Sequence, residues 1–178
     1  MGQSPFALRW ARPEDCSAIR QLIFRSFLEA QDSPRGLSPE TLARRVLQRL
    51  DRLEELLVTQ ASFLVLVAVA PSGALAGCLL LDVEDIDRAS GEPQAFIIYL
   101  AVAPPWRDGR LAKRLVRHAA REAYKRGCRY LAAEVGLGPH GQLKTTQWLG
   151  FKPERCIVSI PCTPQGLPPA PGAKALQG

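Results

Sequence analysis

Hydrophobic and polar residues along this chain follow two different periods, which predict helices near its start and strands in its middle. Residues 6–10 alternate between apolar and polar side chains, as in a short strand. Pro13 and the two acids after it predict the start of a helix, because proline suits the first helical position and acids favour the positive helix end. A second helix is predicted over residues 38–57, where leucine and valine recur at helical spacing.

The centre of the chain predicts a buried antiparallel hairpin followed by a third strand. Nearly continuous apolar segments cover residues 63–70 and 74–83, and Pro71-Ser72-Gly73 links them tightly. Residues 82–93 are polar and predict a loop, and residues 94–102 predict another buried strand.

The C-terminal part predicts two helices that alternate with two strands. They are a helix over residues 110–126 that Gly127 ends, a strand over 130–135, a helix over 141–149 and a last strand over 156–161. The resulting order, β-α-α-β-β-β-α-β-α-β, predicts an α/β (α+β) fold in which helices pack against a mixed sheet.

Length and composition fit one globular domain without metal or disulfide staples. The 178 residues are 47% hydrophobic and 22% charged, which excludes a disordered chain. We expect residues 5–162 to form this domain, and residues 163–178, rich in proline and glycine, to form a flexible tail. The five cysteines are scattered without a Cys-x-x-Cys pair and histidines number only two, so we expect reduced thiols and no metal site.

Two observations favour a cytoplasmic location without a membrane partner. The longest uncharged apolar run, residues 61–70, is too short to span a bilayer as a helix. Residues 1–6 contain no apolar signal core, so nothing there marks the chain for export.

The charge of the chain points to an anionic partner. The net charge is +6 at pH 7, and most basic residues are arginines. Nucleic acid, a membrane surface or a phosphorylated cofactor would suit this charge, and the bidentate arginine fork keeps the phosphorylated cofactor in consideration. A high arginine content also arises from genome composition alone. Nucleic-acid binding is disfavoured, because aromatic residues make up only 7% of the chain and do not interleave with the basic ones.

The connection from the third buried strand into the next helix carries the most specific chemical signal. The strand ends at Val102, and a short arginine-bearing loop leads to a helix that begins near Arg110. The first N–H groups of a helix lack intrahelical partners and lie at the positive end of its dipole, so this place can bind phosphate. An ordinary strand-to-helix connection is the alternative interpretation, and spacing alone does not separate the two.

Residues 102–112 resemble the acyl-CoA-binding signature of the GNAT superfamily (GCN5-related N-acetyltransferases). That signature places an Arg or Gln three residues before a Gly and five before a Gly or Ala, and here Arg107 and Ala112 fit it. Arg110 stands at the middle glycine position and Asp108 replaces the usual glycine after the arginine, so the motif is degenerate. The Trp-Leu-Gly-Phe sequence at 148–151 is similar to the family's ending of its last helix. The resemblance covers residues 5–161 and implies a mostly antiparallel central sheet flanked by about four helices.

The resemblance also implies a site for acetyl-CoA (coenzyme A). The pantetheine arm would insert between strands 94–102 and 130–135, and a backbone N–H near Leu100 or Val102 would polarise the thioester carbonyl. Backbone N–H groups at the start of the helix would cradle the diphosphate. These residues are Arg107, Asp108, Gly109, Arg110, Leu111 and Ala112. The Arg110 side chain would either weaken the cradle by its bulk or pair with a cofactor phosphate.

Three residues are candidates for proton transfer in such a reaction. Glu134 stands where some relatives carry a carboxylate base, and partial burial there would make it a better base; a surface glutamate is the alternative. Thr146 takes the place of a tyrosine acid, and its alkanol is a far poorer acid. His140, before the last predicted helix, would serve as a base, an acid or a solvated turn residue.

The resemblance implies an N-acetyltransferase that moves an acetyl group from acetyl-CoA to a primary amine of a small molecule or a protein. The acceptor site would lie between the first two helices and loop 82–93, whose acids either suit a cationic amine or form a solvated loop. The alternative is a catalytically weak or inactive acyl-CoA-binding protein that acts as a sensor or scaffold. An unpaired sheet edge after the last strand leads to a further hypothesis, a homodimer in which a second subunit covers that edge.

Overall fold

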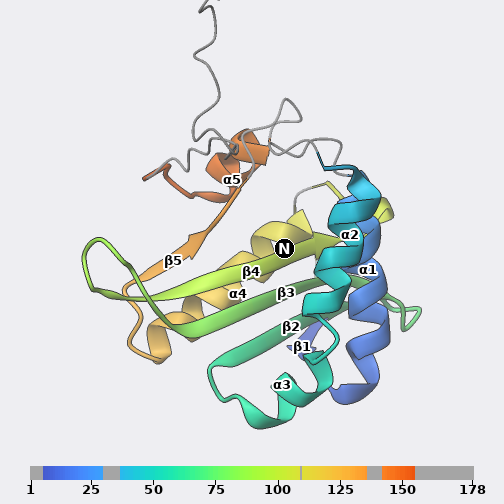
Figure 1. Ribbon diagram of the computed structural model, residues 1–178, viewed down its shortest axis with the longest axis horizontal. Coiled ribbons are helices and arrows are strands. Elements are labelled where there is room, and N and C mark those ends of the chain that lie inside the picture. The colour runs from blue at the N-terminus through green and yellow to red at the C-terminus, as the bar shows by residue number, and fades with distance from the viewer. Residues whose placement is uncertain (1–5, 30–36, 109, 136–141, 155–178) are drawn as a thin grey trace, which may run out of the picture.

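A twisted sheet of five strands forms the centre of the molecule (Figure 1). The computed structural model describes residues 6–29, 37–108, 110–135 and 142–154. The strands are β1 (Ala7–Trp10), β2 (Phe63–Val69), β3 (Leu75–Ile86), β4 (Pro93–Val102) and β5 (Tyr130–Ala133), and they lie in this order across the sheet. All neighbours are antiparallel except β4 and β5, which are parallel. The predicted α/β fold with a mostly antiparallel sheet is therefore confirmed.

Helices cover both faces of this sheet (Figure 1). On one face lie α1 (Cys16–Glu29), which follows a short 3₁₀ turn, η1 (Pro13–Asp15), and then α2 (Pro39–Arg49) and α3 (Leu53–Thr59). On the other face lies α4 (Arg110–Lys125), which follows a second 3₁₀ turn, η2 (Pro104–Trp106). The last described helix is α5 (Gln142–Leu149).

Alternating side chains of the central strands divide the apolar core in two. Leu79 and Leu81 of β3 belong to the cluster that includes Leu115 of α4. Leu80, between them, belongs to the cluster that includes Ile19 of α1. All five side chains are almost fully buried, as expected for a strand covered on both faces.

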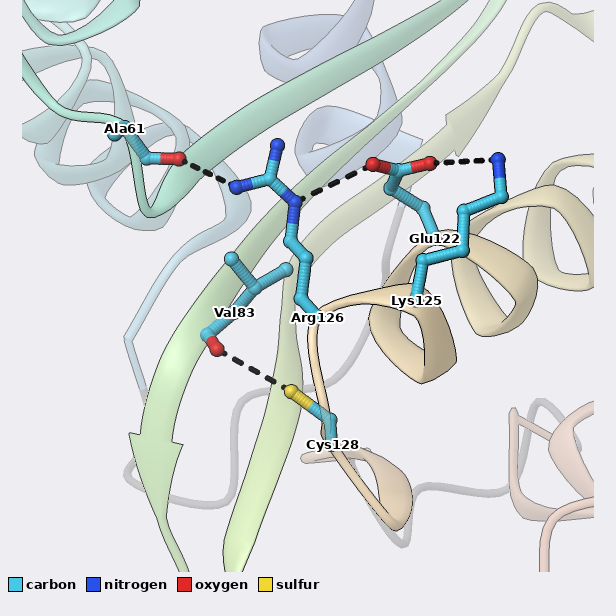
Figure 2. Close-up of polar contacts among 6 residues, drawn as sticks. All are labelled: Ala61, Val83, Glu122, Lys125, Arg126 and Cys128. Atoms are coloured by element: carbon cyan, nitrogen blue, oxygen red, sulfur yellow. Dashed lines mark hydrogen bonds and ion pairs between the residues drawn. The ribbon is translucent and has the colours of Figure 1, made fainter.

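The C-terminal end of α4 is fastened to the sheet by polar contacts (Figure 2). Arg126 donates from Nε to Oε1 of Glu122 at 3.3 Å and from Nη1 to the carbonyl of Ala61 at 3.1 Å. The Cys128 thiol donates to the carbonyl of Val83 at 3.2 Å. Gly127, with φ of +86°, ends the helix as predicted, because this backbone conformation suits glycine. These contacts hold the segment after α4 against β3 and the residues before β2.

The predicted helix over residues 38–57 is wrong as a single element. The chain breaks at Leu50, whose N–H is shared between the carbonyls of Val46 and Leu47, and resumes as α3 at Leu53. The break lets α2 pack against α1 while α3 packs against β2. Leu50 and Leu53 are both buried across the break, so tertiary packing overrides the local preference for one helix.

The predicted loop over residues 82–93 is too long. Strand β3 continues to Ile86 and pairs with Pro93 of β4, so that only residues 87–92 connect the two strands. A register shift between Asp82 and Asp85 accommodates the extra length of β3. Residues 82–86, the first part of the polar segment that suggested a loop, therefore belong to β3.

The other predicted elements agree with the structure to within two or three residues, apart from those beyond its described part. The hairpin between β2 and β3 turns at Gly73, whose φ is +82°. The last predicted strand, residues 156–161, and the predicted tail, 163–178, lie outside the described residues. Among the described residues, no helix is both long enough and apolar enough to cross a membrane.

Candidate functional site

The edge strand β5 is much shorter than its neighbour β4. Strand β5 pairs with β4 only from Gln94 to Ile97, whereas β4 continues to Val102 (Figure 1). The pairing with β5 ends where β4 has a bulge. Tyr99 pairs with Leu80 of β3 and Ile97 pairs with Leu81, so Ile98 is the extra residue of the bulge. Beyond Ile97, this edge of β4 has no partner strand among the described residues.

The backbone of Leu100 and Val102 points toward this open edge. The N–H of Ala103 donates to the carbonyl of Ala76 at 2.9 Å, which makes these two a hydrogen-bonded pair across β3 and β4. Paired and unpaired positions alternate in an antiparallel ladder, so Leu100 and Val102 turn their N–H and C=O groups away from β3. The strand therefore presents the backbone N–H groups of Leu100 and Val102 at the edge where the family resemblance implied contact with a thioester.

Arg107 joins three elements at the end of β4. Its Nε donates to the carbonyl of Val102 at 2.8 Å, and its Nη1 pairs with Oε2 of Glu29 at the end of α1. Tyr99 of β4 also contacts Phe27 of α1 edge to face, with ring centroids 5.9 Å apart. These contacts hold the C-terminal part of α1 beside the open edge of β4. Sequence analysis missed Glu29, because nothing local links it to a residue 78 positions away.

Helix α4 begins at Arg110, directly beside that edge. The backbone N–H of Arg110 donates to Oδ1 of Asp108 at 3.0 Å, and its Nε lies 3.7 Å from Oδ2 of the same carboxylate. The Arg110 side chain is 89% exposed, so it does not plug the start of the helix. Leu111 is buried in the core and Ala112 is half-buried. Gly109 lies outside the described residues.

The three candidates for proton transfer come from the segments after β5. Glu134 directly follows the end of β5 and is exposed, so of the two alternatives left open by the sequence the structure shows the surface glutamate. Thr146 is half-buried on α5, and its carbonyl accepts from the N–H of Phe151 at 3.1 Å. His140 lies outside the described residues. Helix α5 lies beyond the end of β5, on the side where β5 diverges from β4 (Figure 1).

Asp85, near the end of β3, and Asp87, in the connection to β4, have internal hydrogen-bond partners. Asp87 is buried, and its Oδ1 accepts from the N–H groups of Ala89 and Ser90 at 2.9 and 2.7 Å. Oδ2 of Asp85 accepts from Nε2 of Gln94 at 2.7 Å. Asp87 thus shapes the connection itself, and it is not an exposed anion for an amine.

Two hollows lie along α1 in the described part of the chain. One, of about 210 Å³, lies beside the end of β4 and is lined by Leu22 and Arg25 of α1 together with Ala103 and Pro104. The other, of about 370 Å³, lies near the start of α1, among residues that include Cys16, Arg20, Asp51 and Glu54. Only the first adjoins the residues that surround the open edge of β4.

The described cysteines do not suit nucleophilic chemistry. Cys16, Cys78 and Cys128 are buried and free. Burial raises the pKa of Cys78 to about 12, so its thiol stays protonated at neutral pH. Cys156 and Cys162 lie outside the described residues.

The arrangement of open edge, turn and helix start is that of an acyltransferase fold. A family model described as the acetyltransferase (GNAT) family matches residues 17–151. The chain therefore belongs to the GNAT acetyltransferase family, whose members use an acyl-CoA donor. No protein with a curated function matches the sequence.

Solved structures share this fold at low sequence identity. A putative acetyl transferase from Pyrococcus furiosus superposes with a TM-score of 0.69 at 19% identity, over 88% of this chain and 99% of that one. Ribosomal-protein-alanine N-acetyltransferase from Brucella melitensis biovar Abortus 2308 gives 0.60 at 18% identity, over 88% and 99%. AAC(6')-Iy, in complex with the bisubstrate analogue CoA-S-monomethyl-acetylneamine, gives 0.61 at 21% identity, over 88% and 97%.

Proposed function

We propose that this protein is an N-acetyltransferase that moves an acetyl group from acetyl-CoA to a primary amine of a small molecule or a protein. The observation that carries the proposal is the open edge of β4, which ends beside the start of α4. Backbone groups at the edge suit an extended amide-bearing chain, and the start of a helix suits a diphosphate. One ligand that contains both parts is an acyl-CoA.

The cofactor-binding residues that we propose lie along this edge and in the turn that follows it. Leu100 and Val102 would donate backbone N–H groups toward the thioester carbonyl, where charge develops during acyl transfer. The turn from Arg107 to Ala112 would hold the diphosphate through backbone N–H groups and two guanidinium groups. When bound, acetyl-CoA supplies the thioester from which the acetyl group is transferred.

Glu134 is our candidate base for the acceptor amine. An exposed carboxylate just past β5 can take a proton from an ammonium group directly or through one water. The nitrogen would then bond to the carbonyl carbon and the carbon–sulfur bond would break, so that the sulfur would leave either as the thiolate anion or, after taking up a proton, as the thiol. Thr146 is a poor proton donor, and His140 is the second candidate for this role.

The second candidate function is a catalytically weak or inactive acyl-CoA-binding protein that acts as a sensor or scaffold. Asp108 and Arg110 occupy glycine positions of the motif, and Thr146 occupies the place of a tyrosine acid. Each of these departures lowers the expected turnover without removing the open edge of β4.

A titration and a turnover assay together test the proposal. Calorimetry of the full chain with acetyl-CoA should show saturable binding, and thiol release should depend on an added amine. The Glu134→Gln variant should keep the binding and lose most of the turnover, while Glu55→Gln, a matched exposed glutamate on α3, should keep both. Binding without amine-dependent thiol release would favour the sensor, and absence of binding would contradict both functions.

A further inference from the structure

Both arginines of the turn are paired with carboxylates of the chain itself. Nη1 of Arg107 pairs with Oε2 of Glu29, and Arg110 contacts Asp108 through its backbone N–H and its side chain. Carboxylate and phosphate oxygens accept from the same donors, in the same fork geometry. A diphosphate that binds here therefore meets arginine N–H donors that already contact Glu29 and Asp108.

We propose that Glu29 and Asp108 are intramolecular competitors of the cofactor diphosphate and thereby set the affinity of this chain for acetyl-CoA. This inference rests on the proposed function. Each carboxylate holds one arginine of the turn, and each also repels the negative charge of an incoming diphosphate. Binding therefore has to separate two ion pairs that the free protein contains.

The two pairs can open without disrupting the fold. Arg107 is anchored through Nε on the carbonyl of Val102 at 2.8 Å, so Nη1 can leave Glu29 while the guanidinium stays at the edge of β4. Asp108 and Arg110 have side chains that are 61% and 89% exposed, and exposed pairs are weak. The two carboxylates should therefore lower the affinity for CoA by a measurable factor, and they should not prevent its binding.

Neutralising either carboxylate should strengthen cofactor binding. We expect Asp108→Asn and Glu29→Gln each to lower the calorimetric dissociation constant for CoA by about two- to fivefold. The amide oxygen of asparagine can still accept from the N–H of Arg110, so Asp108→Asn should fold like the parent. Acetylpantetheine, which lacks the diphosphate, should bind both variants as it binds the parent.

Two matched variants separate this effect from general changes in charge or helix capping. Asp51→Asn removes a carboxylate that pairs with Arg20 at 2.5 Å near the start of α1, away from the turn. Ser38→Ala removes the side chain that accepts from the N–H of Thr41 at 3.2 Å at the start of α2. Neither should change the dissociation constant for CoA, although Ser38→Ala should lower the thermal stability.

The results distinguish this inference from the proposed function. If CoA binds the parent, and Asp108→Asn and Glu29→Gln bind it equally or more weakly, the competition does not exist and the acyl-CoA site stands. The competition is also contradicted if Asp51→Asn or Ser38→Ala strengthens CoA binding as much as Asp108→Asn and Glu29→Gln do. If CoA binds neither the parent nor any variant at millimolar concentration, the proposed function and this inference both fail.

Discussion

Gly77 sets how closely α4 approaches the sheet. A Cβ atom at this position would lie 3.2 Å from the carbonyl oxygen of Ala101 and 3.2 Å from Cδ1 of Leu115. Leu115 is fully buried and the carbonyl belongs to the neighbouring strand, so neither can easily move away. The absence of a side chain at one residue thus brings the start of α4 near the end of β4.

We expect Gly77→Val to destabilise the protein by about 1–3 kcal/mol, because it overpacks the contact between α4 and β3. Urea unfolding followed by circular dichroism measures this change in the free energy of unfolding. Ala74→Val, at an exposed position of the preceding turn, is the control and should change it little. Equal stability of the two variants would show that α4 is not held as closely as described.

Cys78 should make stability fall at alkaline pH. Burial raises the pKa of its thiol from 9.0 to about 12, so between these values the unfolded chain has lost a proton that the folded chain keeps. The free energy of unfolding therefore decreases as pH rises above 9, by at most about 1.4 kcal/mol per pH unit from this group.

Urea unfolding at several pH values between 8 and 11 tests this expectation. The Cys78→Ala variant should lose stability more gently over this interval than the parent, whatever its stability at pH 8. Other alkaline groups titrate equally in both proteins, so the difference in slope belongs to Cys78. Identical slopes would contradict the burial of this thiol.

At the scale of elements, the divergence of β4 and β5 is the feature on which the site depends. It exposes one edge of β4 while the other edge stays paired with β3 up to Val102. Proline lacks a backbone N–H group. It is therefore tolerated at strand positions whose N–H makes no hydrogen bond to a neighbouring strand, and it is disruptive at positions whose N–H makes one. Proline substitution therefore distinguishes the two edges of one strand.

Leu100→Pro and Val102→Pro should fold, because their N–H groups point to the open edge. At least one of them should lose about 10²- to 10³-fold in turnover, the effect expected when one N–H donor to the thioester carbonyl is removed. Ala101→Pro removes a ladder hydrogen bond to β3 and should unfold the protein. Circular dichroism and the thiol-release assay measure these outcomes. Full activity of both edge variants would contradict the assigned donors.

Elements that end at a glycine or a tight turn were predictable from the local sequence, whereas elements whose ends depend on packing against distant residues were not. The end of α4 followed from Gly127, and the hairpin between β2 and β3 from Gly73. The break at Leu50 carries neither proline nor glycine, and it arises from packing against two different partners. The extension of β3 to Ile86 depends on its pairing with β4, which a single strand does not reveal.

The same distinction applies to the candidate site. The strand, turn and helix at residues 102–112 follow one another in sequence, so their juxtaposition was predictable. The contact of Arg107 with Glu29 was not, because it depends on how α1 crosses the sheet. The exposure of Glu134 depends on where β5 ends relative to its neighbours, so the sequence alone left a partly buried and a surface glutamate equally open.

At the scale of the whole molecule, positive charge is concentrated on α4. Its exposed side chains include Arg110, Arg117 and Arg121, and the net charge of the chain is +6. The opposite side of the helix, with Leu111, Leu115 and Ala119, packs on the sheet. An anionic cofactor would thus approach a basic surface that leads to the open edge of β4.

We expect CoA binding to weaken several-fold when sodium chloride is raised from about 50 to about 500 mM, because salt screens exposed charges. Acetylpantetheine should bind almost independently of salt, since it carries no diphosphate. Calorimetric titration at each salt concentration measures both dependences. Equal salt dependence of the two ligands would contradict a role for the arginines of the turn.

The most direct test of the account is calorimetric titration of the full chain with acetyl-CoA, repeated after Arg107→Ala and Arg110→Ala are combined. The account predicts one saturable site with a dissociation constant between about 1 μM and 1 mM, and weaker binding by the double variant. No heat of binding at millimolar acetyl-CoA, or equal affinity in the two proteins, would contradict the proposal that this turn holds the cofactor.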